Sequence, residues 1–166
     1  LDGDGRNDLC YLAGEGLTRA LGTRLQLPDG QLGPEYIFDL ERPRSVTVRD
    51  VDGKPGQEIL TIDSRSGRIK MLQLERRKPD ANSLPERLIQ FGFGKQGSGR
   101  DRDLTIGDVD GDGRPDIYLC ALQGPNRLFM NRGGLRFEEQ PIGAAACPDQ
   151  LSTGAVLADV DGDGDA

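Results

Sequence analysis

Short apolar stretches alternate with glycine- and aspartate-rich turns along the chain. The stretches "SVTV" (45–48), "ILTID" (59–63), "LTIG" (104–107) and "IYLCA" (117–121) are each too short for a helix and are bounded by turn residues. Short runs of this kind, rich in β-branched residues, are typical of β-strands. The pattern therefore predicts an all-β fold made of short antiparallel strands.

Weaker stretches extend this pattern. "RLFM" (127–130) and "LRFEE" (135–139) flank the turn residues "NRGG" and predict a hairpin. The N-terminal part repeats the arrangement around "PDGQ". It predicts strands at "LCYLA" (9–13), "RLQL" (24–27) and "LGPEYIFDL" (32–40), and "GAVLA" (154–158) predicts one more near the other end.

Two segments interrupt the strands. "ERRKPDANSLPE" (75–86) predicts a solvated insertion, in which Arg76, Arg77 and Lys78 either grip an anionic sugar or, as charge runs usually do, face solvent. "FGFGKQGSGRD" (91–101) predicts a glycine-rich connection between repeat units. A phosphate-binding loop is the weaker alternative there, because no helix signal follows.

An aspartate-rich tract occurs four times. Its best copy is "DVDGDGRPD" (108–116), and the second aspartates of the four copies stand at positions 2, 52, 110 and 161. The spacings of 50, 58 and 51 residues are too long for a helical pair and suit one four-stranded blade of a β-propeller. The repeat therefore predicts a partial β-propeller of about three four-stranded antiparallel blades. The predicted units are 1–49, 50–107, 108–158 and the start of a fourth at 159–166.

The spacing within the tract is that of a calcium loop. Calcium takes about six to eight oxygen ligands, which a tight loop supplies from alternate positions. In D-x-D-G-D-G-x-x-D, positions one, three, five and nine supply carboxylates and position seven a backbone carbonyl, while the glycines at positions four and six permit positive φ. Two carboxylates about 4 Å apart repel by roughly 4 kcal/mol at an effective dielectric of about 20, so a cation would stabilise the loop. The predicted ligands of the best copy are Asp108, Asp110, Asp112, Asp116 and the carbonyl of Arg114, whose side chain is expected in solvent.

The first and last copies are incomplete. Position one of the first would precede Leu1, and position nine of the last would follow Ala166, so we expect metal binding there to depend on flanking residues. The candidate ligands in these two copies are Asp2, Asp4, Arg6, Asp8, Asp159, Asp161 and Asp163.

The second copy carries Lys54 at position five. Its ammonium could lie among Asp50, Asp52 and Glu58 and supply the positive charge of an ion. We therefore expect this loop to be metal-free or to bind metal weakly. The alternative is that Lys54 simply points to solvent.

Other interpretations of the tract fit the sequence less well. A solvated Asp-Gly turn that binds nothing is an alternative for one copy, but the tract recurs in register with strands. An EF-hand needs an acidic ligand at position twelve, where this chain has Leu119. Thrombospondin type 3 repeats share the wording but recur at shorter spacing, with little apolar sequence between.

Composition limits the partners. The chain has 21 basic and 28 acidic residues, a net charge of -7, and no histidine, and its acids gather in the tracts. Cations are therefore favoured as partners over nucleic acid or an anionic membrane. No apolar run approaches the length of about 18 residues that a membrane-inserted helix needs. Cys10, Cys120 and Cys147 are either small buried hydrophobes or, for the latter two, a disulfide.

The tracts and hairpin resemble the FG-GAP or VCBS repeat family, the calcium-loop β-propeller repeats of integrin α-subunit heads and many secreted bacterial proteins. The matching text is "RDLTIGDVDGDGRPDIYLC", "GAVLADVDGDGD" and "NRLFMNRGGLRFEE". The resemblance implies Ca²⁺ in a loop between the first and second strands of each blade. It also implies further blades of the same protein and a secreted, periplasmic or cell-surface location.

The resemblance and composition together favour a non-enzymatic extracellular binding or adhesion scaffold for a protein or glycan ligand. The alternative is part of a secreted propeller enzyme such as a polysaccharide lyase. Histidine, the commonest general base, is absent, and no pair of acids stands apart from the calcium loops, so catalysis has little support.

Overall fold

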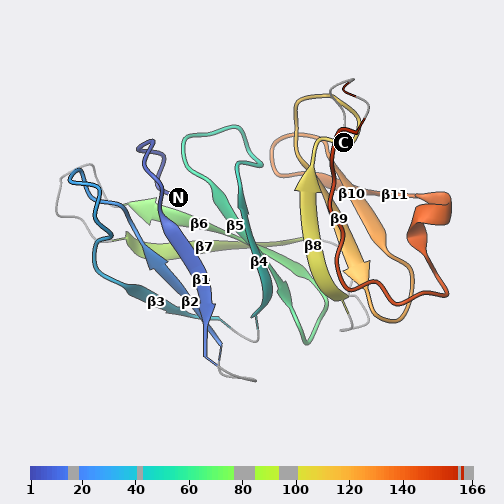
Figure 1. Ribbon diagram of the computed structural model, residues 1–166, viewed down its shortest axis with the longest axis horizontal. Helices are drawn as coiled ribbons and strands as arrows, with labels where there is room; N and C mark the ends of the chain where they lie inside the picture. Colours follow the sequence, from blue (N-terminus) through green and yellow to red (C-terminus); the bar gives the residue numbers. More distant parts are fainter. Residues whose placement is uncertain (15–18, 41–42, 77–84, 94–100, 161, 163–166) are drawn as a thin grey trace.

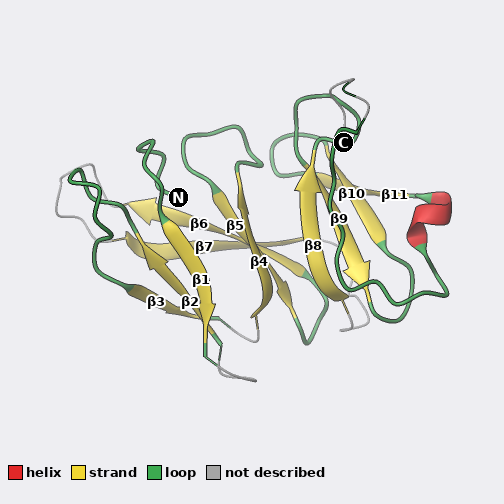
Figure 2. Cartoon of the chain, in the orientation of Figure 1, coloured by secondary structure: helices red, strands yellow, loops and turns green. Residues whose placement is uncertain are grey.

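The structure, a computed structural model, describes residues 1–14, 19–40, 43–76, 85–93, 101–160 and 162. In this part of the chain the strands form three antiparallel sheets, each of which takes its strands in chain order (Figures 1 and 2). The all-β prediction is therefore confirmed. None of the three sheets closes on itself within the described residues.

The first sheet consists of β1 (Leu9–Ala13), β2 (Ala20–Arg24) and β3 (Tyr36–Asp39). The second consists of β4 (Pro43–Arg49), β5 (Glu58–Asp63), β6 (Ile69–Arg76) and β7 (Pro85–Phe93). The third consists of β8 (Asp101–Gly107), β9 (Asp116–Ala121), β10 (Arg127–Asn131) and β11 (Phe137–Gln140), and a 3-10 helix, η1 (Gly143–Ala146), follows it. No helix in the described ranges has the length and apolar character that crossing a membrane requires.

The Asp-rich loops join the first and second strands of the second and third sheets. Residues 50–57 connect β4 to β5, and residues 108–115 connect β8 to β9. This is the order that the resemblance implies. Each of these sheets begins one strand before its loop, whereas the predicted repeat units begin at the loop.

Two predicted strands are wrong. β2 ends at Arg24, so "RLQL" (24–27) contributes only an isolated bridge between Gln26 and Leu32. The Gln26 amide donates instead to the Asp8 carboxylate at 2.9 Å, which takes it out of the ladder. "GAVLA" (154–158) is not a strand: Gly154 lies close to Asp103 of the edge strand β8, but none of the described strands pairs with this segment in a ladder.

The irregular segments are shorter than predicted. β6 continues through Arg76 and β7 begins at Pro85, so the insertion reduces to 77–84, which lies outside the described residues together with Arg77 and Lys78. Both ends of the predicted glycine-rich connection belong to strands, and its centre, 94–100, also lies outside the described residues.

The second sheet packs between the other two. All six residues of β5 are buried, which explains its nearly continuous apolar sequence. Because successive side chains of a strand point to opposite faces, Leu60 and Ile62 pack with Ile117 of the third sheet, whereas Ile59 packs with Leu21 of the first. The core is therefore two apolar layers, one on each face of the central sheet.

The segment 143–152 covers the outer face of the third sheet. The Tyr118 hydroxyl donates to the Ala145 carbonyl at 2.6 Å, and the Asn126 side chain donates to the Ser152 hydroxyl at 2.8 Å. Cys120 lies on the same face of β9 as Tyr118 and is buried.

The three cysteines are free thiols. Cys120 is buried, and Cys10 and Cys147 are half-buried. Burial raises the pKa of the Cys10 thiol to about 11, against a smaller lowering by the positive charge of the chain's amino group. Cys120 is therefore a small buried hydrophobic residue in this structure and not one half of a disulfide with Cys147.

Polar contacts tie the second sheet to the third at both ends of β4. The fully buried Asn131 donates through Nδ2 to the Val51 carbonyl at 2.9 Å and to the Pro115 carbonyl at 3.1 Å. At the opposite end of β4, the Ser45 hydroxyl donates to Asp103 at 2.6 Å. The two sheets are therefore positioned by directional bonds as well as by apolar packing.

We expect Asn131→Ala to lower the free energy of unfolding by about 3 kcal/mol, because each buried polar group left without a partner costs about 1 to 3 kcal/mol. Urea unfolding would measure the loss. Asn7→Ala is the matched control, because Asn7 is exposed and its backbone amide, which the substitution keeps, donates to the Gln26 side chain. Equal losses in the two variants would contradict a role for Asn131 in joining the sheets.

Candidate metal centre

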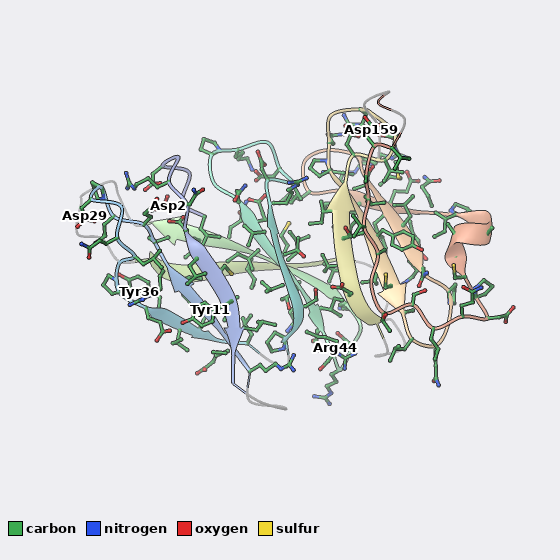
Figure 3. All side chains as sticks on the ribbon, viewed as in Figure 1. Asp2, Tyr11, Asp29, Tyr36, Arg44 and Asp159 are labelled. Atoms are coloured by element: carbon green, nitrogen blue, oxygen red, sulfur yellow. The ribbon has the colours of Figure 1, made fainter. Side chains whose placement is uncertain are left out.

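The Asp-rich loops lie on one edge of the molecule. The loop before β1, the β4–β5 loop and the β8–β9 loop all project toward the upper edge in Figure 1. Asp2 and Asp159, from the first and last tracts, lie near that edge in Figure 3. We call this edge, formed by residues 1–8, 50–57, 108–115, 159, 160 and 162, the loop rim.

In the third loop, backbone amides bind the first and last carboxylates. Asp108, at position one, accepts from the amides of Asp112 at 3.1 Å and Gly113 at 2.8 Å. Asp116, at position nine, accepts from Val109 at 2.9 Å and from Asn131, at the end of β10, at 2.7 Å. The loop is thereby wrapped on itself and fastened to the third strand of its sheet.

Three carboxylates of this loop face one another. Asp108, Asp110 and Asp116 each offer an oxygen within 4.8 Å of the other two. Asp116 is only 1% exposed, and this burial, with the charges of Asp110 and Asp112, raises its pKa against the opposing amide bonds from Asn131 and Val109. A set of hard oxygen donors at this spacing suits calcium.

Asp112 is not part of this group. The guanidinium of Arg114 pairs with the Asp112 carboxylate, and its Nε donates to the Asn131 carbonyl at 2.9 Å. The Arg114 side chain is exposed, as expected, but it also fastens the loop to β10. Nη1 of Arg132, a second arginine, lies 3.7 Å from Oδ2 of Asp110.

The first loop repeats this arrangement. Arg6 pairs with Asp4, and its Nε donates to the Gln26 carbonyl at 2.8 Å. Asp8 accepts from the Gln26 amide, as Asp116 accepts from Asn131. The carboxylates of this loop, Asp2, Asp4 and Asp8, do not form a close group like that of the third loop in the part of the chain that the structure describes.

In the second loop, side-chain nitrogens form an ion pair and hydrogen bonds with two of the carboxylates. Asp50, Asp52 and Glu58 form a group like that of the third loop. Lys54 Nζ lies 2.8 Å from Asp52, and the Gln73 amide donates to Asp52 at 3.0 Å and to Glu58 at 2.8 Å. Lys54 is 71% exposed but does not merely point to solvent: of the three acids named for it, its ammonium pairs with Asp52.

These contacts shift two pKa values. Burial favours a higher pKa for Asp52, but the hydrogen bonds from Lys54 and Gln73 and the Lys54 charge outweigh it and lower the pKa. The hydrogen bond to Asp52 and its charge raise the pKa of Lys54. Both groups are therefore held in their charged forms.

Sequence reasoning missed Gln73. The residue lies on β6, and continuing the β5–β6 register from the Ile59–Leu72 pair sets it opposite Glu58. Side chains opposite each other on a sheet are neighbours. In the third sheet, the register sets the apolar Met130 opposite Asp116, at the position that corresponds to Gln73. A polar residue in place of an apolar one there was the sequence feature that could have identified Gln73.

The loop glycines have the predicted conformation. Gly111 and Gly113 have φ of 69° and 83°. In the second loop, proline stands at position six, and the positive φ moves one residue on, to Gly56 at 112°. In the last tract, the Gly162 amide donates to Asp159 at 2.6 Å, whereas Asp161 and Asp163 lie outside the described residues.

Neighbouring loops touch along the loop rim. The Gln57 amide donates to the Leu1 carbonyl at 3.2 Å. A Cβ on Gly3 would stand 2.6 Å from the Gly56 nitrogen, whereas a Cβ on Gly5 would meet nothing within 4 Å. Glycine at position four of the first loop therefore permits this contact with the second.

Comparison with known families matches one part of the chain. Residues 108–166 match the FG-GAP-like repeat. This match confirms the resemblance over that stretch, which contains the third loop and the last tract. Searches of curated proteins and of solved structures found no match.

We expect Gly3→Ala to destabilise the protein more than Gly5→Ala. Both glycines have φ near 80°, so alanine at either position incurs the left-handed penalty of about 1 to 2 kcal/mol. Only alanine at position 3 would also clash with the second loop, which adds about 1 kcal/mol or more. Equal losses in urea unfolding would show that the two loops do not depend on close contact.

Proposed function

We propose that the chain is a calcium-stabilised segment of a β-propeller that acts as a non-enzymatic binding or adhesion scaffold. The observation that carries the proposal is the group Asp108, Asp110 and Asp116, in the β8–β9 loop and at the start of β9, within the part of the chain that matches an FG-GAP-like repeat. The three sheets pack face to face in chain order, as blades of a propeller do. Each four-stranded sheet would then be one blade, and further blades of the same protein would be its neighbours.

The chemistry of the loops fits a cation. The donors are carboxylate oxygens, and protein cations already contact them: Lys54 at Asp52, Arg114 at Asp112 and Arg132 at Asp110. The residues that would hold Ca²⁺ are Asp108, Asp110, Asp112, Asp116 and the carbonyl of Arg114. The aspartates of the first and last tracts are weaker candidates.

A bound calcium ion would add positive charge among the three carboxylates, of which Asp110 already lies 3.7 Å from Arg132. The residues of the loop would do the rest. Asp108 closes the turn through two amides, and Asp116 joins the loop to β10 through Asn131. A stiffer loop would therefore hold the first three strands of the blade in register.

The partner on this scaffold would be a protein or a glycan, and the setting would be extracellular, periplasmic or on the cell surface, as for FG-GAP repeats generally. Binding arrays of glycans and extracellular proteins, run with calcium and with chelator, would test the scaffold. Turnover of uronate polymers by the full-length protein would contradict it.

We expect Asp110→Ala/Asp112→Ala to abolish the stabilisation by calcium. At about a hundred times the dissociation constant, one site adds about 2.7 kcal/mol to the free energy of unfolding. Without calcium the variant should be nearly as stable as the parent, because the lost ion pairs are partly exposed and worth at most about 1 kcal/mol each. Melting with calcium and with chelator would measure both effects.

The control for this variant is Asp39→Ala/Asp149→Ala, which removes two exposed acids outside the loops. It should keep the calcium response. A chelator response in the loop variant equal to that of the parent would refute the site.

We expect Lys54→Asp to create or strengthen a calcium site in the second loop. The change removes the ammonium from Asp52 and restores a carboxylate at position five. Lys54→Met is the control, because it removes the cation without adding a ligand. Calorimetric titration should give a higher calcium stoichiometry for the aspartate variant alone, and no gain would contradict this interpretation of the loop.

A further inference from the structure

We propose that Arg114 is an internal competitor of the cation: it holds Asp112 in the metal-free loop and so sets the calcium affinity of the third loop. The inference rests on the proposed function of that loop. It assigns to Arg114 a positioning role through its side chain, beyond the backbone carbonyl that the loop pattern predicts.

The guanidinium is held at a fixed place. Its Nε donates to the carbonyl of Asn131, a residue only 1% exposed and bonded to two neighbouring segments, 50–57 and 108–115. The arginine therefore approaches Asp112 from an anchored position, unlike a freely moving surface side chain. Its planar fork lets one guanidinium make both bonds.

Both carboxylate oxygens of Asp112 contact Arg114. Its Oδ1 accepts from the Arg114 amide at 2.9 Å, and its Oδ2 pairs with the Arg114 guanidinium. This leaves Asp112 outside the group formed by Asp108, Asp110 and Asp116. To join a cation with those three, the Asp112 carboxylate must move toward them, against the pull of the guanidinium.

The first loop carries the same device. Asp4, at position five, accepts from the Arg6 amide at 2.9 Å and pairs with the Arg6 guanidinium, whose Nε donates to Gln26. Two loops separated along the chain thus share one three-part arrangement of position-five acid, position-seven arginine and backbone carbonyl, which belongs to Gln26 just past β2 in the first and to Asn131 at the end of β10 in the third. The repetition shows that the pairing belongs to the loop design and is not an accident of one side chain.

The two roles that Arg114 could have predict opposite signs. A competitor raises the free-energy cost of cation binding, so its removal tightens binding. A residue that only orients Asp112 toward the ion lowers that cost, so its removal weakens binding. Arginine stays charged throughout the accessible pH range, so the competition cannot be relieved by titration of the guanidinium.

The test is the calcium dissociation constant of Arg114→Gln, measured by calorimetric titration of the full chain. Because the Arg114 side chain is 44% exposed, the pair is partly screened, and we expect binding to tighten by about two- to fivefold. Arg114→Lys keeps the charge but lacks the planar fork of the guanidinium. Its calcium affinity should lie between those of the parent chain and of Arg114→Gln.

Two controls separate the pairing from general charge and from folding. Arg136→Gln removes a charge from the neighbouring hairpin, where the residue is exposed, and should leave the affinity nearly unchanged. In an Asp112→Asn background, Arg114→Gln should not tighten calcium binding, because the carboxylate for which the arginine and the ion compete is absent. Melting in chelator reports any structural loss separately from affinity.

Unchanged or weaker calcium binding by Arg114→Gln would overturn this inference alone, as would an equal gain in Arg136→Gln. A gain that persists in the Asp112→Asn background would also overturn it. Failure of the parent chain and of every variant to bind calcium would instead overturn the proposed function, and the inference with it.

Discussion

Carboxylates crowded into a nine-residue loop repel one another, and the loop rim is arranged around that repulsion. In each described loop, amides and a basic side chain offset part of this repulsion. Backbone amides bind the position-nine acid in all three, while Arg6, Arg114 or Lys54 binds a second acid. The loops are therefore ordered turns in which part of the acidic charge is already neutralised.

The position-nine acid joins the charged loop to the apolar core. Glu58 and Asp116 are the first residues of β5 and β9, and they are 3% and 1% exposed. Burying a carboxylate is costly unless its oxygens are bonded. Their bonds run back to the amide at position two and, in the third sheet, across to Asn131, so the same interactions that satisfy the charge also set the register of the first three strands.

Periodicity and repetition predicted most of the fold, because a strand buried on both faces, such as 59–63, is recognisable from its own residues. The third-loop group of three was likewise predictable from the spacing of its acids. "GAVLA" failed because a strand also needs a partner, which local sequence does not contain. The side-chain bond of Arg114 and the role of Gln73 were missed for a related reason: their partners, Asn131 and Glu58, are distant in sequence and meet them only through the strand register.

Contacts between loops make the loop rim continuous. Asn131 bonds the second loop at Val51 while its amide holds Asp116 in the third, and Gly3 packs on Gly56 between the first and second. Neighbouring acidic loops also repel across these contacts. The central loop is the one with a lysine in place of an aspartate, so its charge is partly neutralised by a covalently attached cation. The sheet on which both apolar layers depend thus carries a loop with one acid fewer than the third loop.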